Sequence, residues 1–248
     1  MGVTKMKVLS IGNSFSQDAH KWLHKLAKLN GIDMQTLNLY IGGCSLERHW
    51  TNIQTDAEAY DFEPNGILTN WQISIESALK LTGWDIITVQ QVSSKSGQIE
   101  TYEPYLSGLI ALIRKWQPKA EIWLHQTWAY EIDSDHSGFA NYDNDQKKMY
   151  QCIVSTAKAA AAPIPAKIIP AGTLIQTLRE TVPEFDYAKG GMTLNRDGYH
   201  LTRDYGRFAV AALWIRTLTG ATVEAAEFED FDPVLLQKIL AVVNAQEV

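Results

Sequence analysis

Three side chains that lie far apart in the sequence have the types needed for nucleophilic catalysis: Ser14, Asp197 and His200. A serine hydroxyl attacks a carbonyl only after a base takes its proton, and a histidine imidazole is a suitable base near neutral pH. A carboxylate bonded to the imidazole selects its tautomer and stabilises its protonated form. Because Asp197 and His200 are three residues apart, one loop can bring their side chains together. The pattern therefore predicts a Ser14–His200–Asp197 triad.

Such a reaction also needs hydrogen-bond donors for the negative charge that develops on the carbonyl oxygen. The donors that we expect are the backbone N–H of Ser14, a glycine N–H such as that of Gly43, and a side-chain amide. Gly43 belongs to a Gly42–Gly43 pair that is equally typical of a turn ending a strand. An oxyanion hole and a simple turn are both compatible with this pair.

Short β-rich runs alternate with stretches of helical period along most of the chain. Strands are predicted at residues 7–11, 34–41, 85–89, 120–124 and 167–169. Helices are predicted at residues 17–29, 73–81, 104–116, 143–162, 174–181, 205–218 and 233–244. The alternation predicts a three-layer α/β/α sandwich with a mainly parallel five-stranded sheet, whereas residues 45–70 show no clear period. Since ligands bind at the carboxyl ends of such strands, the residues that follow each strand are the candidate site.

The composition indicates an ordinary globular protein. The 248 residues are 46% hydrophobic and 20% charged, and no repeat or linker interrupts residues 1–248, so a single domain is expected. A net charge of −6 argues against nucleic-acid and membrane-surface partners. Neither the cysteines, Cys44 and Cys152, nor the pair His20 and His24 has the pattern of a metal site. With no apolar run long enough for a signal peptide core, we expect a cytoplasmic protein, unless a leader has been trimmed. The oligomeric state is not indicated.

Residues 11–16, Ile-Gly-Asn-Ser-Phe-Ser, resemble the first sequence block of the SGNH (GDSL-like) hydrolases, with Asn13 where many members carry Asp. The Asp197-x-x-His200 pair resembles their last block, and Gly43-x-Ser45 resembles the glycine region of their second block. The resemblance extends over residues 6–220. Within these residues the sequence is similar to a bacterial SGNH-like subfamily of uncharacterised domains. The resemblance implies a flavodoxin-like sandwich, the triad above, and hydrolysis of acyl esters without a metal or another cofactor.

One block departs from the family pattern. The third block usually reads Gly-x-Asn-Asp, and its Asn side chain lies in the oxyanion hole. Here residues 89–93 read Val-Gln-Gln-Val-Ser, so that Asn is missing. The amide of Gln91 is expected to replace it, with Gln90 as the alternative. Successive strand residues point to opposite faces, so only one of the two glutamines can face the site.

Aromatic residues and a histidine near the predicted edge of the site are candidates for substrate binding. They are Trp50, His125, Trp128 and Tyr130. Aromatic faces suit the C–H surfaces of carbohydrates, although loop aromatics can equally close the core. Together these features predict a serine esterase that removes small acyl groups such as acetyl from a carbohydrate or similar polar substrate. The alternatives are a lipase or thioesterase, and a non-catalytic glycan-binding protein with an SGNH-like fold.

Overall fold

The computed structural model describes residues 5–246, in which seven strands form one sheet in the order β4-β3-β2-β1-β5-β6-β7. The strands are β1 Met6–Gly12, β2 Met34–Tyr40, β3 Tyr60–Pro64, β4 Gln72–Ile73, β5 Ile86–Val89, β6 Glu121–His125 and β7 Lys167–Ile169. Strands β2, β1, β5, β6 and β7 run parallel, and β3 and β4 are antiparallel additions at one edge. The chain leaves β1 for β2 on one side and reaches β5 on the other, so β1 lies at the topological switch point.

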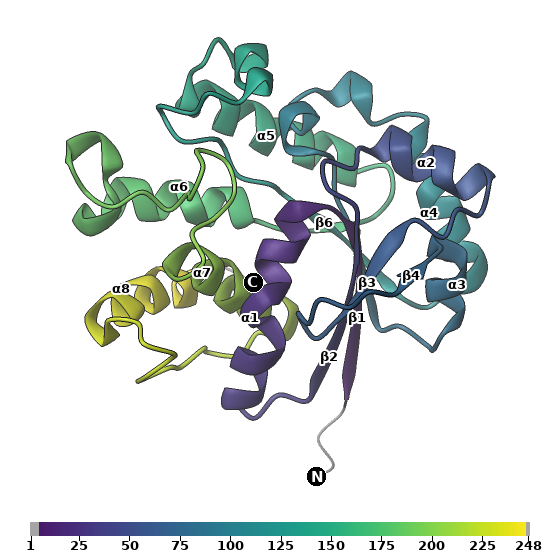
Figure 1. Cartoon of the computed structure of the whole chain (residues 1–248), viewed down its shortest axis with the longest axis horizontal. Coiled ribbons are helices and arrows are strands. Elements are labelled where there is room, and N and C mark those ends of the chain that lie inside the picture. Colours follow the sequence, from purple (N-terminus) through teal and green to yellow (C-terminus); the bar gives the residue numbers. More distant parts are fainter. Residues whose placement is uncertain (1–4, 247–248) are drawn as a thin grey trace.

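Helices cover both faces of this sheet (Figure 1). One set, α1 Ser14–Leu29, α6 Ala171–Thr181, α7 Tyr205–Thr219 and α8 Pro233–Asn244, packs on one face; α2 Leu46–Gln54, α3 Ile75–Lys80 and α4 Tyr105–Trp116 pack on the other. Helix α5 Gln146–Ala161 contributes side chains to both apolar clusters. Short 3₁₀ helices are η1 Ser93–Lys95, η2 Ile99–Thr101, η3 Ser137–Tyr142, η4 Pro183–Phe185 and η5 Tyr187–Lys189. Within residues 5–246, no helix is both long and apolar enough to cross a membrane.

The predicted three-layer α/β/α class is confirmed, but the predicted strand number of five is wrong. The additional strands β3 and β4, and helix α2, lie in the stretch that showed no clear period. Strand β3 buries its first and fourth residues rather than alternate ones, and β4 has two residues. Neither strand has the period-two pattern by which a half-buried strand is recognised in a sequence.

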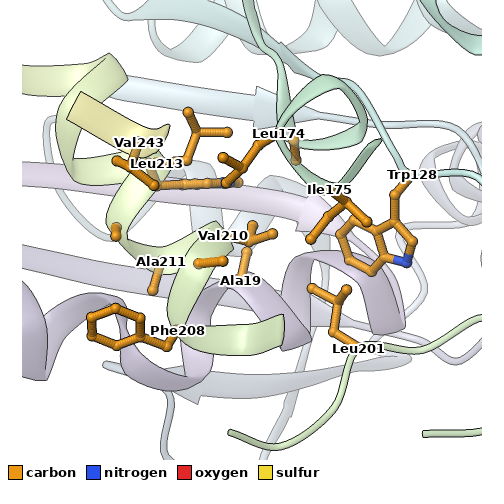
Figure 2. Close-up of a cluster of buried hydrophobic side chains, with 14 of the residues drawn as sticks. Ala19, Trp128, Leu174, Ile175, Leu201, Phe208, Val210, Ala211, Leu213 and Val243 are labelled. Carbon is orange, nitrogen blue, oxygen red and sulfur yellow. The ribbon is translucent and has the colours of Figure 1, made fainter. Parts of the chain in front are cut away.

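Helix α7 forms the centre of the larger apolar cluster. Its residues from Phe208 to Ile215 are all buried, because α1, α6 and α8 surround it. Figure 2 shows Val210 of α7 with Ala19 of α1, Leu174 of α6 and Val243 of α8. A helix that is apolar on all sides is stable only inside such a packed layer. The loop before α7, which carries the predicted Asp and His, is thereby joined to a rigid element.

A fully buried carboxylate fastens that loop to α1. Asp18 accepts hydrogen bonds from the Arg196 side chain at 3.0 Å, from the Leu201 backbone N–H at 2.9 Å and from Arg207 Nε at 2.7 Å. Asp18 lies one helical turn after Ser14, while Arg196 and Leu201 flank the Asp197–His200 segment. The three donors therefore fix the position of this segment relative to the start of α1.

Three histidines are buried among apolar and aromatic side chains. His20 and His125 both meet the Trp214 ring edge-on, with ring-centroid distances of 5.3 and 5.2 Å. His49 on α2 accepts a hydrogen bond from Tyr60 at Nδ1. Burial lowers the pKa of each imidazole to about 3, and the neighbouring His20 also lowers that of His125. All three are therefore neutral in the folded protein near neutral pH.

Replacing Asp18 by Ala should reduce the free energy of unfolding by about 3 kcal/mol. This is the lower end of the range for breaking a buried ion pair, because Arg196 and Arg207 are partly exposed and regain water. Urea denaturation measures the change. Lys189→Ala, which removes an exposed ion pair with Asp186, is the control and should leave stability unchanged. Equal stability of the Asp18 variant and the wild type would contradict the anchoring role.

Stability should fall as the pH is lowered from 6.5 towards 3. Above pH 6.5 the imidazoles of His20, His49 and His125 are neutral in both the folded and the unfolded protein. Below pH 6.5 they bind protons in the unfolded chain but stay neutral in the folded protein, because burial lowers the pKa of each. At pH 5 the loss should reach about 2 kcal/mol for each histidine, given an unfolded pKa of about 6.5. Urea denaturation at pH 7 and pH 5 measures it, and His49→Gln should reduce the slope by one proton. A flat profile would be the contrary result.

Candidate functional site

The fold brings the predicted nucleophile and base to one cavity. Ser14 is the first residue of α1, directly after β1, and its neighbour Asn13 caps the helix by accepting the N–H of Phe15. His200 lies on the loop before α7. Both Ser14 and His200 line a cavity of about 210 Å³ at the carboxyl end of β1 and β2.

Asp197 and His200 form the pair that the sequence predicted. The His200 Nδ1–H donates to Asp197 Oδ2 at 2.8 Å, and the His200 backbone N–H donates to Asp197 Oδ1 at 2.7 Å. Burial alone would raise the pKa of Asp197, but these bonds and the Tyr199 N–H lower it below its usual value. Asp197 is therefore an anion, and the lone pair at His200 Nε2 is left to act as a base.

Ser14 Oγ has no hydrogen-bond partner in residues 5–246, and it does not bond to His200 in this structure. In the absence of substrate, catalytic hydrogen bonds are often long and form only when the substrate is in place. Ser14 therefore presents a free hydroxyl in the cavity that the His200 imidazole also lines, and its role as a nucleophile stays a prediction.

Two backbone N–H groups, one of them that of Ser14 itself, are available as oxyanion donors. Within the described residues, the N–H groups of Ser14 and Gly43 have no acceptor. Gly43 has φ = +62°, a left-handed conformation that glycine adopts readily, and it lines the cavity together with Ser14. Its place in the turn between β2 and α2 agrees with the predicted role.

The structure contradicts the predicted donor role of Gln91. Its Oε1 accepts from the N–H groups of Leu46 and Val92, and its Nε2 donates to the carbonyl oxygen of Thr101 at 3.0 Å. Gln91 is buried and is absent from the cavity lining. Its amide therefore holds loop backbone and does not face the cavity.

Gln90 is also committed elsewhere. Its Nε2 donates to Asn13 Oδ1, and its Oε1 accepts the Nδ1–H of His125 at 2.8 Å. Asn13 in turn donates from Nδ2 to the carbonyl oxygen of Cys44 at 3.0 Å. Gln90 thus orients Asn13, which links the start of α1 to the glycine turn. Neither glutamine supplies a donor to the cavity.

The four residues predicted to bind substrate do not line the cavity, so that prediction is corrected. His125 and Tyr130 are buried, the former behind Gln90 and the latter behind Ser93. Trp128 is buried and donates from its indole to the carbonyl oxygen of Tyr199. Trp50 packs against Gly108 of α4. The sequence predicted these residues at the edge of the site, but three of them are buried in the core and the half-buried Trp50 packs against α4.

The cavity wall contains four polar side chains that were not predicted from the sequence. They are Tyr40, Ser93, His136 and Tyr199. Tyr199 lies between the predicted Asp and His, which was an available signal, and Ser93 follows the two glutamines. No sequence pattern indicated His136, because the loop before η3 comes close to the site only when the chain is folded. Its ring lies 4.7 Å from the Tyr199 ring.

No metal centre is evident in the described part of the chain, where no three His, Cys, Asp or Glu side chains are placed to bind one ion. The spaced pair His20 and His24 makes separate contacts. His20 Nε2 accepts from Ser10, and His24 Nδ1 bonds to the carbonyl oxygen of Met34. The residues that line the cavity instead bring together a serine hydroxyl, an imidazole and backbone N–H groups without acceptors.

Comparisons with solved structures confirm the SGNH-like fold that the sequence motifs indicated. A putative SGNH hydrolase from Slackia heliotrinireducens is 20% identical, with 86% of this chain and 98% of that chain covered and a TM-score of 0.56. A catalytic mutant of an acetylxylan esterase from Geobacillus stearothermophilus is 12% identical, with 90% and 100% covered and a TM-score of 0.56. At these identities the likeness concerns the fold. No curated protein matched the sequence.

Closer similarity links the chain to one family. A crystal structure of a DUF4886 family protein from Bacteroides uniformis ATCC 8492 is 40% identical, with 97% of this chain and 94% of that chain covered and a TM-score of 0.89. A family model described as "Domain of unknown function (DUF4886)" matches residues 7–238. The chain therefore belongs to the DUF4886 family and has an SGNH-like fold.

Proposed function

We propose that this protein is a serine ester hydrolase that removes small acyl groups such as acetyl from a carbohydrate or a similarly polar alcohol. The observation that carries the proposal is the shared cavity of Ser14 and His200, with the Nδ1 of His200 bonded to Asp197. Asp197 does not line the cavity itself and acts through its bond to His200.

The chemistry follows from the lone pair at His200 Nε2. This atom accepts the proton of Ser14 while Oγ attacks the ester carbonyl, and Asp197 stabilises the imidazolium that forms. The N–H groups of Ser14 and Gly43 bind the oxyanion of the tetrahedral intermediate. Its collapse releases the alcohol, which takes the proton from His200. Water, activated by the same imidazole, then hydrolyses the acyl-enzyme.

The size and lining of the cavity favour a small acyl group. A volume of about 210 Å³ holds an acetyl group and part of an alcohol. Its walls carry the hydroxyl or imidazole groups of Tyr40, Ser93, His136 and Tyr199, and few purely apolar side chains. A long acyl chain would need an extended apolar channel, whereas polar aromatic walls suit the hydroxyls and C–H faces of a sugar.

The likeness to an acetylxylan esterase supports the same class of substrate. That enzyme shares the fold at 12% identity, so its substrate is a guide for a screen. Acetylated sugars and acetylated oligosaccharides are the first compounds to test. A lipase or thioesterase has the same triad chemistry and is separated from this proposal by acyl chain length.

Ser14→Ala should lower kcat for an activated acetyl ester by a factor on the order of 10⁶, and His200→Ala should lower it about equally, because triad members act as a unit. Steady-state hydrolysis of p-nitrophenyl acetate measures both. The thermal midpoint should stay within a few degrees of the wild-type value, since Ser14 Oγ has no partner to lose. Wild-type turnover by the Ser14 variant would show that another residue is the nucleophile.

The wild-type protein should prefer acetyl to longer acyl groups. We expect kcat/KM to fall at least about tenfold from the acetyl to the octanoyl p-nitrophenyl ester, since a misfit in a closed pocket is worth about 1–3 kcal/mol. Acetylated xylose and O-acetylated oligosaccharides then test the alcohol. A preference for octanoyl would favour the lipase or thioesterase reading. Glycan binding without any hydrolysis that depends on Ser14 would favour a non-catalytic binding protein.

A further inference from the structure

The oxyanion hole described so far has two backbone donors and no side-chain donor. The amides of Gln90 and Gln91, at the position where the SGNH resemblance places an Asn, donate to Asn13 and Thr101. A side-chain donor in the remaining wall of the cavity would complete the hole. Four polar side chains in that wall are the candidates: Tyr40, Ser93, His136 and Tyr199.

Ser93 is the candidate that follows the same strand, β5, as the block in which the SGNH resemblance places the Asn. It follows β5, which pairs with β1 in the register Ile11↔Val89, so the segments after the two strands lie at the same edge. Ser93 is the first residue of η1 and lines the cavity together with Ser14 and Gly43. Its backbone N–H has no acceptor within residues 5–246. Ser93 is therefore placed to offer donors beside those of the hole.

The other candidates lie on different sides. Tyr199 lies beside the predicted base, with its ring tilted and 4.2 Å from the His200 ring, and His136 meets the Tyr199 ring edge-on. This is the side on which the leaving alcohol receives its proton. Tyr40 ends β2, and its hydroxyl lies near Gly42, where a Cβ would meet it at 3.2 Å.

The contact between Tyr130 and Ser93 determines where the Ser93 proton goes. The two hydroxyl oxygens are 2.8 Å apart, and Tyr130 is fully buried. Among the described residues, Ser93 Oγ is the one partner of the phenol. If Ser93 donated, the Tyr130 proton would be left buried without an acceptor, which is unfavourable. A phenol is also a stronger donor than an aliphatic hydroxyl. Tyr130 therefore donates, and the Ser93 O–H is free.

We propose that Ser93 completes the oxyanion hole through its hydroxyl, in place of the missing Asn, and that Tyr130 is the positioning residue that orients this hydroxyl. The assignment rests on the proposed esterase function. A donor of this kind strengthens its bond as charge develops on the carbonyl oxygen, so it acts on kcat rather than on KM.

Ser93→Ala should lower kcat about 10²-fold and change KM little, with p-nitrophenyl acetate as the substrate. The pair Ser93→Thr and Ser93→Val provides a matched comparison, because the two side chains have nearly the same shape and differ in the hydroxyl. Ser93→Thr should retain a kcat at least about tenfold above that of Ser93→Val, whatever either does to stability. Ser94→Ala is the control in the same turn, outside the cavity lining, and should keep wild-type kcat.

Tyr130→Phe tests the positioning role. It should lower kcat about tenfold in the wild-type background, and it should have no further effect on kcat in the Ser93→Ala background. A merely structural role of Tyr130 would lower kcat equally in both backgrounds, and that result would overturn the assignment for Tyr130.

Two failures are distinguishable. If Ser14→Ala is inactive while Ser93→Ala, or Ser93→Val, keeps the kcat of the wild type, the esterase function stands and the Ser93 assignment is wrong. If the wild-type protein shows no hydrolysis that depends on Ser14, the proposed function is wrong and the assignment falls with it.

Discussion

The buried carboxylate of Asp18 is the constraint on which the candidate site depends. It joins two segments more than 170 residues apart, the helix that begins with Ser14 and the loop that carries Asp197 and His200. Three donors converge on a carboxylate that has no contact with water. Because such a network is stable only when all its members are in place, it holds the Asp197–His200 loop at one position relative to Ser14.

A second polar network sets the opposite wall of the cavity. From the interior outward, His125 donates to Gln90, Gln90 donates to Asn13, and Asn13 donates to the carbonyl oxygen of Cys44. The chain of bonds fixes the turn that contains Gly43 against the start of α1. Polar residues at the strand ends thus serve two different purposes: some line the cavity, and others hold the backbone that supplies its N–H donors.

Much of the fold and the contact between Asp197 and His200 could be predicted from the sequence, because strand and helix periods and the spacing of these two residues are local patterns. The roles of Gln91 and Trp128 could not, since local sequence does not say which neighbour a buried side chain will meet. Gln91 donates to Thr101, ten residues away, and Trp128 donates to the backbone of Tyr199 in the loop before α7. His136 enters the site through the path of a loop that has no regular period.

Covalent labelling is the sharpest test of whether Ser14 is a nucleophile activated by His200, as proposed above. The protein is incubated with a fluorophosphonate, and peptide mass spectrometry locates the adduct. We expect a single phosphonylated serine at position 14, with labelling strongly slowed in the His200→Ala variant. Absence of an adduct, or an adduct on another residue, would contradict the claim.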